Sequence, residues 1–215
     1  MDSLYTKQHI RDALDPSPST PEEDMRWLAA APPEVAARVR ATLTTRRTPA
    51  AVLIPLVERD TGMTVLLTQR ATTLKDHAGQ ISFPGGRIEP QDADAWHAAL
   101  RETYEEIGVR SELVEFAGYL PDHIVISGFR VTPVVGFVQP QYQLQIAAAE
   151  VHEVFEVPLD YILDAANHKS RQRTIGELTI DIHDIPYGDR NIWGATAGML
   201  MTLGQRLQTR TARTP

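Results

Sequence analysis

A helical segment that ends at a glycine and follows a predicted β-hairpin is the feature that most constrains the fold of this chain. Residues 92–107 show helical periodicity, and Gly108 stands where a left-handed glycine commonly ends a helix. Upstream, residues 51–57 and 63–68 are strand-like apolar runs joined by a loop with hairpin chemistry. The sequence therefore places a pair of antiparallel strands before a central helix.

Strand-like segments also follow the helix. Residues 114–120 and 130–138 are rich in β-branched or aromatic residues, and a further strand is expected at 178–182. A short helix is expected after Pro158, and a last helix over about 195–207. Strands on both sides of a central helix predict a mixed α/β domain, not a strict alternation of strands and helices.

The chain length favours one domain with terminal additions, because 215 residues fall short of two domains of about 150 residues each. A proline-rich stretch leads into Thr20, and helices are expected to begin at Thr20 and near Pro33. We expect an N-terminal helical arm over residues 1–49, packed on a main domain over 50–208, and a C-terminal tail over 209–215.

The composition excludes several classes of function. The chain has no cysteine, which rules out disulfides, thiolate metal sites and a cysteine nucleophile. Its net charge of −7 argues against binding to nucleic acid or anionic membranes. The longest apolar run, residues 50–57, is too short to cross a membrane, and the start of the chain shows no secretory signal. These features predict a cytoplasmic protein that binds any phosphate through local cations or metal ions.

Three glutamates lie close together on the predicted helix. Glu102, Glu105 and Glu106 have the i, i+3, i+4 spacing that places them on one face, where their charges repel each other. We expect four residues on the other side to face the core: Leu100, Thr103, Tyr104 and Ile107. A solvated acidic face is the common explanation of such a pattern, and a metal site is the alternative.

A glycine turn upstream favours the metal site. Residues 83–86 read Phe-Pro-Gly-Gly, which brings bare backbone close to whatever the glutamates hold. Hard divalent cations prefer carboxylate and carbonyl oxygens, and Mg²⁺ usually completes its shell with water and substrate phosphates. The turn and the glutamates together therefore predict a divalent-cation site.

These residues resemble the Nudix box of Nudix hydrolases. Gly86, an acid at Asp92 and the run Arg-Glu-x-x-Glu-Glu-x-Gly-Val over residues 101–109 follow the pattern of that box. The sequence departs from the pattern because Asp92 replaces glutamate, one extra residue precedes Arg101, and Thr103 takes an aliphatic position. The resemblance implies a Nudix fold, a mixed β-sheet sandwiched between helices, with the box as a loop–helix–loop against one edge.

The same resemblance implies roles for individual residues. Glu102, Glu105 and Glu106, with the backbone of Gly86, would hold one or more Mg²⁺ or Mn²⁺ ions. Arg101 would orient the glutamates from beside the metal site.

A second signature is similar to the motif of the coenzyme A pyrophosphatase subfamily. It consists of Leu-Leu-Thr-Gln-Arg-Ala over residues 66–71, then Gly79, then Phe-Pro-Gly-Gly over 83–86. Lys75 stands where the subfamily has an arginine, and Ala71 where it has a serine. The likeness to the subfamily extends over roughly residues 50–208.

This second resemblance implies a set of substrate-binding residues: Arg70, Lys75, Gly85 and Gly86. Arg70 and Lys75 would contact phosphate groups of the substrate. From the residues alone, ion pairs with Asp76 or with the acidic helix explain the two cations equally well.

The implied activity is hydrolysis of the pyrophosphate in coenzyme A or its thioesters, which gives 3′,5′-ADP and 4′-phosphopantetheine or its acyl form. The general base would be Glu105 or Glu150, which precedes the subfamily segment Val-Phe-Glu-Val-Pro-Leu over residues 154–159. Glu150 is equally well explained as a solvated loop acid. Coenzyme A or an acyl-CoA is the expected partner, with no nucleic acid or membrane, and a homodimer is left open.

Two other functions stay open at this point. The same box serves hydrolases of other nucleoside diphosphate derivatives, from which only the upstream signature separates this chain. A non-catalytic ligand sensor could use the same scaffold, although a pure binder would have little reason to keep glutamates that repel each other.

Other polar and aromatic residues are assigned to structure. Asp181, His183 and Asp184 alternate with isoleucines, which is typical of the polar side of an edge or half-exposed strand. Three tryptophans are expected to serve in packing and not in base stacking: Trp27, Trp96 and Trp193.

Overall fold

The computed structural model describes residues 5–19, 33–34, 37, 47–125, 128–175 and 178–211. The helices in this part are α1 (Lys7–Ala13), α4 (Ala95–Ile107), α5 (Leu159–Leu163) and α6 (Gly194–Thr211), with 3₁₀ turns η2 (Ser111–Leu113) and η3 (Ala165–Asn167). The strands are β1 (Thr48–Arg59), β2 (Gly62–Arg70), β3 (Ile81–Ser82), β4 (Gly85–Arg87), β5 (Val114–Tyr119), β6 (His123–Ile124), β7 (Phe129–Val138), β8 (Val151–Pro158), β9 (Lys169–Ile175), β10 (Leu178–Tyr187) and β11 (Arg190–Trp193).

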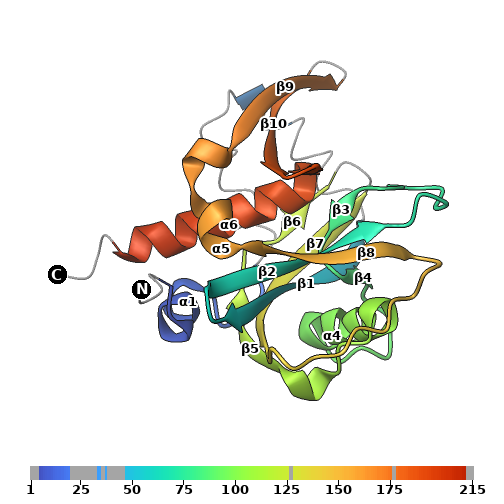
Figure 1. Ribbon diagram of the computed structural model, residues 1–215. Coiled ribbons are helices and arrows are strands. Elements are labelled where there is room, and N and C mark those ends of the chain that lie inside the picture. Colours follow the sequence, from blue (N-terminus) through green and yellow to red (C-terminus); the bar gives the residue numbers. More distant parts are fainter. Residues whose placement is uncertain are drawn as a thin grey trace.

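Eight of these strands form one mixed sheet (Figure 1). Its main order is β3-β2-β1-β7-β5, while β4 pairs with β1, β6 with β7 and β8 with β2. The pairing of β1 with β7 is parallel, and the other pairs are antiparallel. The remaining strands, β9 to β11, form a separate three-stranded sheet. The predicted mixed α/β architecture is confirmed.

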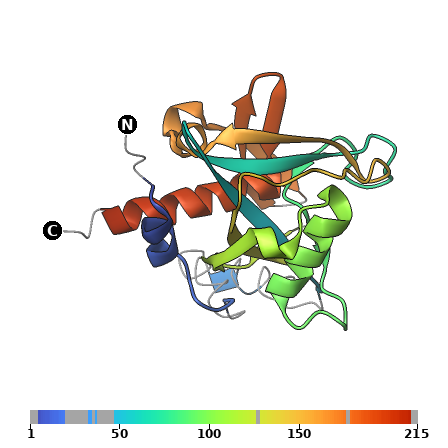
Figure 2. The same ribbon diagram turned by 60° about the horizontal axis from the view of Figure 1, so that its bottom comes forward.

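Helices cover both faces of the main sheet (Figures 1 and 2). On one face α4 contacts β1, β4 and β7, and its Ala98 and Ile107 share an apolar cluster with Leu53 of β1. On the other face α1, α5 and α6 pack on the sheet, where Leu200 belongs to the same cluster as Ile54. The sandwich expected of a Nudix fold is therefore confirmed. The helix of the box lies over a face of the sheet, however, and not against its edge.

The β-hairpin and the end of α4 follow the prediction. Arg59 stands opposite Gly62 in the antiparallel pair of β1 and β2, as the hairpin signal indicates. Gly108 adopts a left-handed conformation with a φ of 77° directly after α4. The helix begins at Ala95, three residues later than expected, because the Asp94 side chain caps it by accepting from the His97 N–H at 2.9 Å.

Helix α4 buries a different face from the one predicted. Thr103 and Ile107 are buried as expected, with exposures of 1% and 0%, and Leu100 is partly buried. Tyr104, in contrast, is 54% exposed, and Glu106 is only 4% exposed. The prediction for Tyr104 was wrong because the alanine-rich side of the helix packs on the sheet, where small side chains permit close approach, and Glu106 lies on that side.

The start of the chain contributes to the core through α1, a helix that was not predicted. Ile10 is fully buried, and a Cβ built on Gly118 of β5 would lie 2.5 Å from the Cβ of Leu14, which shows how closely the two segments approach. The helices predicted from Thr20 and Pro33 fall in residues 20–46, most of which lie outside the described ranges. The division into an arm, a main domain and a tail stays a prediction. In the described residues, no helix is long and apolar enough to span a membrane.

Candidate active site

Glu106 is the most buried of the predicted glutamates. One of its oxygens, Oε2, accepts from the backbone N–H of Gly85 at 3.3 Å, and Oε1 lies 4.0 Å from Nη1 of Arg70. Burial raises the pKa of this carboxyl to about 8, and the nearby charges of Glu102 and Glu150 raise it as well. A carboxylate in this position is costly unless a further cation stabilises its charge.

Gly86 is required by its close approach to Glu102. A Cβ built on Gly86 would lie 2.5 Å from Oε1 and 2.6 Å from Oε2 of Glu102. The neighbouring Gly85 is similarly tight, since its Cβ would lie 2.4 Å from the carbonyl oxygen of Ala51 in β1. Gly86 therefore brings the backbone of β4 directly against α4, and Gly85 brings it against β1.

Arg101 joins the glutamates to the turn before α4. Its guanidinium donates from Nη1 to Glu102 at 2.9 Å and to Glu105 at 3.1 Å, and from Nη2 to the carbonyl of Arg87 at 3.0 Å. Its Nε and Nη2 also bind the two oxygens of Asp92, both at 2.9 Å. This geometry agrees with the orienting role expected of Arg101.

Asp92 holds Arg101 from the turn, and its part in the site could not be read from the sequence. Its side chain is 4% exposed and also accepts from the backbone N–H of Glu89 at 2.8 Å. Hydrogen bonding to Arg101 lowers the pKa of Asp92 and raises that of Arg101 itself. Asp92 therefore supports the glutamates through Arg101, which explains an acid at this position even with altered spacing.

Glu150 reaches the site on a loop that closes the end of α4. Ala147 donates its N–H to the carbonyl of Glu106 at 2.9 Å, and Ala71 donates to the carbonyl of Glu150 at 2.8 Å. Burial raises the pKa of both Glu102 and Glu106, and the charge of Glu150 raises both further. The exposed Glu150 side chain therefore lies near the buried glutamates, although it is 44 positions from Glu106 in the sequence.

The two predicted cations differ in their surroundings. The Arg70 side chain is 28% exposed beside Glu106, and its buried Nε–H has no hydrogen-bond partner among the described residues. Lys75 lies on the exposed loop between β2 and β3 and forms no ion pair with any carboxylate that the structure describes. The structure therefore places Arg70 beside a glutamate of the acidic helix, which is one of the two ion pairs that the sequence allowed. It shows no such contact for Lys75 in the described residues.

The carboxylates suit a divalent cation, although they do not form a finished cluster. Within the described ranges, no three His, Asp or Glu side chains are arranged to hold a metal ion. Burial and the charges of Glu105 and Glu150 raise the pKa of Glu102. Burial and the charges of Glu102 and Glu150 raise the pKa of Glu106. A hard dication with oxygen ligands would offset both the burial and the mutual repulsion, so the residues fit Mg²⁺ or Mn²⁺.

The polar and aromatic residues that were expected to have structural roles form no second candidate site in the described residues. Asp184 is buried and accepts from Nε of Arg171 and Nδ2 of Asn191, both at 2.9 Å, so it is a paired core residue and not the half-exposed one expected. Trp96 packs edge-on against Phe116, as predicted for a packing residue. Trp193 stacks with the guanidinium of Arg171 at 5.5 Å, while Trp27 and the side chain of Asp181 lie outside the described part.

Comparisons with known proteins agree with this geometry. Residues 46–178 match the family model of the NUDIX domain. The chain is 40% identical over 173 residues to a protein named "Uncharacterized Nudix hydrolase NudL" from Escherichia coli (strain K12), with 78% of this chain and 86% of the relative covered. It is 39% identical over 163 residues to a protein of the same name from Enterobacter sp. (strain 638), with coverage of 75% and 83%.

Among solved structures, the chain is similar to a Nudix hydrolase from M. smegmatis, RenU, at 20% identity and a TM-score of 0.49, over 79% of this chain and 88% of that one. The matched domain model spans more than half of the chain, and the curated relatives cover three quarters of it. The chain therefore belongs to the Nudix hydrolase family, whose members use divalent metal ions to hydrolyse pyrophosphate bonds.

Proposed function

We propose that this Nudix hydrolase cleaves the pyrophosphate of coenzyme A or its thioesters into 3′,5′-ADP and 4′-phosphopantetheine or acyl-4′-phosphopantetheine. The observation that carries the proposal is the position of Arg70 beside Glu106. Arg70 belongs to the segment that resembles the coenzyme A pyrophosphatases, and its buried Nε–H has no protein partner in the described residues. A substrate phosphate would supply the missing acceptor.

The glutamates would hold the metal. Glu102, Glu105 and Glu106, with the backbone of Gly86, are the proposed ligands of Mg²⁺ or Mn²⁺, and the bound ion would supply charge neutralisation for the diphosphate. Arg101 keeps two of these carboxylates in place through its bonds to Glu102 and Glu105. Since the Glu105 side chain is 56% exposed, it is also the glutamate that could serve as a general base instead of a metal ligand.

Arg70, Lys75, Gly85 and Gly86 would bind the substrate. Arg70 offers a guanidinium that matches the geometry of phosphate oxygens. Lys75, on its exposed loop, offers a charge without that geometry, so it would reach a peripheral phosphate group. The bare backbone of Gly85 and Gly86 would let the diphosphate lie close to the glutamates.

Glu150 would act as the general base. Its carboxylate would accept a proton from a water as the water oxygen forms a bond to one phosphorus. The bond from that phosphorus to the bridging oxygen breaks, and the bridging oxygen leaves with the other phosphate. Glu105 is the alternative base, because it too is exposed beside Glu102.

Analysis of reaction products tests the proposal. The purified protein is incubated with coenzyme A and Mg²⁺ or Mn²⁺, and the products are identified by mass spectrometry. We expect 3′,5′-ADP and 4′-phosphopantetheine in equal amounts, with none in a reaction that contains EDTA.

A substrate panel separates the alternatives. Faster cleavage of nucleotide sugars or dinucleoside polyphosphates than of coenzyme A would assign the enzyme to another nucleoside diphosphate class. Binding of a nucleotide without turnover of any substrate in the panel would indicate a ligand sensor. We also propose that the protein acts in the cytoplasm and that its partner is a small-molecule substrate.

A further inference from the structure

A second polar cluster lies at the start of β2, the strand that ends with Arg70. Arg59, the last residue of β1, binds Glu156 of β8 with both arms of its guanidinium. Its Nε donates to Oε2 at 3.0 Å, and its Nη2 donates to Oε1 at 2.5 Å. Thr64 of β2 completes the contact by donating its hydroxyl to Oε2 of Glu156 at 2.5 Å. The pair is partly buried, with side-chain exposures of 33% and 21%.

Arg59 also holds the first residues of the loop that leads to Glu150. Its Nη1 donates to the carbonyl of Pro140 at 3.1 Å, and its Nη2 donates to the hydroxyl of Tyr142 at 3.1 Å. The Tyr142 hydroxyl in turn donates to Glu156, and the Arg59 guanidinium lies 5.4 Å from the centre of the Tyr142 ring. Arg59 of β1 therefore joins β8 to this loop, and Glu156 extends the contact to Thr64 of β2. We call Arg59, Glu156 and Tyr142 the clamp.

The protonation states of the clamp are set by these contacts. Burial acts to raise the pKa of Glu156, but hydrogen bonds from Arg59, Thr64 and Tyr142 outweigh it and lower the pKa to about 2. Burial and the bond to Glu156 raise the pKa of Tyr142 to about 12. At neutral pH, Glu156 is therefore charged and Tyr142 keeps its proton, which are the states that the hydrogen bonds require.

The far end of the same loop closes α4. Gln145 donates its N–H to the carbonyl of Ile107 at 2.9 Å, and Ala147 donates to that of Glu106 at 2.9 Å. Glu150 follows three residues later and donates its own N–H to the carbonyl of Ala147 at 2.8 Å. The loop over residues 139–150 thus runs from the clamp to the candidate active site, with backbone hydrogen bonds at the site end and charged side-chain bonds at the other.

We propose that Arg59 is a positioning residue for catalysis: by fixing Tyr142 and Pro140 to Glu156, it holds the loop that sets Glu150 against Glu106. This inference rests on the proposed function only in assigning the base to Glu150. Backbone bonds at the ends of helices open readily unless neighbouring contacts support them. A misplacement of about 1 Å in a catalytic group costs about 100-fold in rate.

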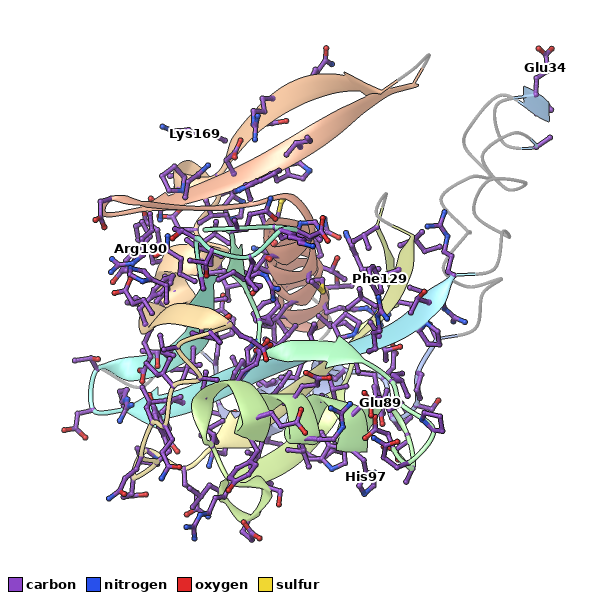
Figure 3. The ribbon with its side chains drawn as sticks, turned by 90° about the vertical axis from the view of Figure 1, so that its right-hand side faces the viewer. Glu34, Glu89, His97, Phe129, Lys169 and Arg190 are labelled. Carbon is purple, nitrogen blue, oxygen red and sulfur yellow. The ribbon has the colours of Figure 1, made fainter. Side chains whose placement is uncertain are left out.

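The matched variants are Arg59→Met and Arg190→Met. Methionine keeps much of the apolar stem of arginine and removes every donor. Arg190 of β11 binds Glu153 on the other side of β8, with Nη2 donating to Oε1 at 2.5 Å, and it stacks on Phe155 at 4.7 Å. This control breaks an ion pair on the same strand and leaves the bonds from Arg59 to Pro140 and Tyr142 in place. Figure 3 shows Arg190 well separated from His97 of α4.

Steady-state kinetics on whichever pyrophosphate substrate the wild-type protein hydrolyses fastest give the first test. We expect Arg59→Met to lower kcat by about 10-fold to 100-fold with KM changed less than about twofold, and Arg190→Met to leave both unchanged. If the clamp acts through Glu150, Arg59→Met added to Glu150→Gln should cause little further loss. The inference would be overturned if the double variant lost activity by the product of the two single losses. It would also be overturned by a wild-type kcat in either Arg59→Met or Glu150→Gln.

Hydrogen exchange gives a test that does not depend on turnover. The amides of Gln145 and Ala147 should exchange about tenfold faster in Arg59→Met than in the wild type, and at the wild-type rate in Arg190→Met. Unchanged exchange in Arg59→Met would overturn the inference for any substrate. A wild-type protein that cleaves no pyrophosphate would instead overturn the proposed function. If Arg59→Met fails to fold, Tyr142→Phe is measured in its place, with the same expected directions.

Discussion

The backbone N–H of Ala147 donates to the carbonyl of Glu106 at 2.9 Å, so the loop that delivers Glu150 also closes the helix that carries the buried glutamate. The last carbonyls of a helix have no partner within the helix itself. Here the loop supplies that partner, and one hydrogen bond couples the positions of two acidic residues. The geometry of the candidate site therefore depends on a segment outside the Nudix box.

Glu106→Gln tests the buried carboxylate. The substitution keeps the shape of the side chain and removes its charge, so turnover should fall by about 100-fold or more. The melting temperature should not fall, because burial already disfavours the charged form of Glu106. Activity is measured at low and saturating metal, with Glu112→Gln, at an exposed glutamate, as the control. Near-normal activity at low metal would contradict a metal-ligand role for Glu106.

Gly86→Ala tests the contact between β4 and α4. The added Cβ would lie 2.5 Å from Oε1 of Glu102, so Glu102 must move and kcat should fall by about tenfold or more. Gly204→Ala in α6 is the control, because its Cβ meets only the end of the Leu163 side chain at 3.0 Å. Equal activity of the two variants would show that the fit of Glu102 against Gly86 does not matter for catalysis.

Ala substitutions at Arg70 and Lys75 test substrate binding. Each should raise KM more than it lowers kcat, which is the signature of binding lost equally from the ground and transition states. Coenzyme A and dephospho-coenzyme A are compared as substrates for each variant. If both substrates respond equally, neither residue contacts the 3′-phosphate, and a contact with the diphosphate remains the explanation.

Glu150→Gln tests the proposed base. It should lower kcat by about 100-fold to 10,000-fold and flatten the acidic limb of the pH–rate profile. The affinity for metal, measured by titration calorimetry, should change little. A variant with the wild-type kcat and the same acidic limb would assign the role of base to Glu105.

The clamp predicts a loss of stability in acid. The hydrogen bonds of the clamp lower the pKa of Glu156 from its usual value of 4.5 to about 2 in the folded protein. Because the folded pKa is the lower one, its contribution to stability is complete above about pH 4.5 and is lost as the pH falls towards 2. Urea unfolding between these pH values should show a smaller decline in Glu156→Gln than in the wild type. Parallel declines would contradict the low pKa.

Local features of the sequence were enough to predict the main elements and the approach of the glycine turn to the three glutamates. The hairpin from β1 to β2 and the end of α4 at Gly108 depend on neighbouring residues and on backbone freedom at glycine. The closeness of Gly86 to Glu102 depends on the absence of a side chain at Gly86. The spacing of the three glutamates also predicted that they lie within neighbouring turns of one helix, because residues three and four apart are neighbours in an α-helix.

Only the tertiary structure decided which side of α4 is buried and what holds the glutamates. Helical periodicity alone could not place Tyr104 in solvent and Glu106 in the core, because the alanine-rich side of the helix fits the sheet more closely. Asp92 reaches the site through its bonds to Arg101, and Glu150 reaches it on the loop whose Ala147 bonds Glu106. The clamp joins residues 97 positions apart. Such contacts arise when the folded chain brings distant segments together, and no local pattern records them.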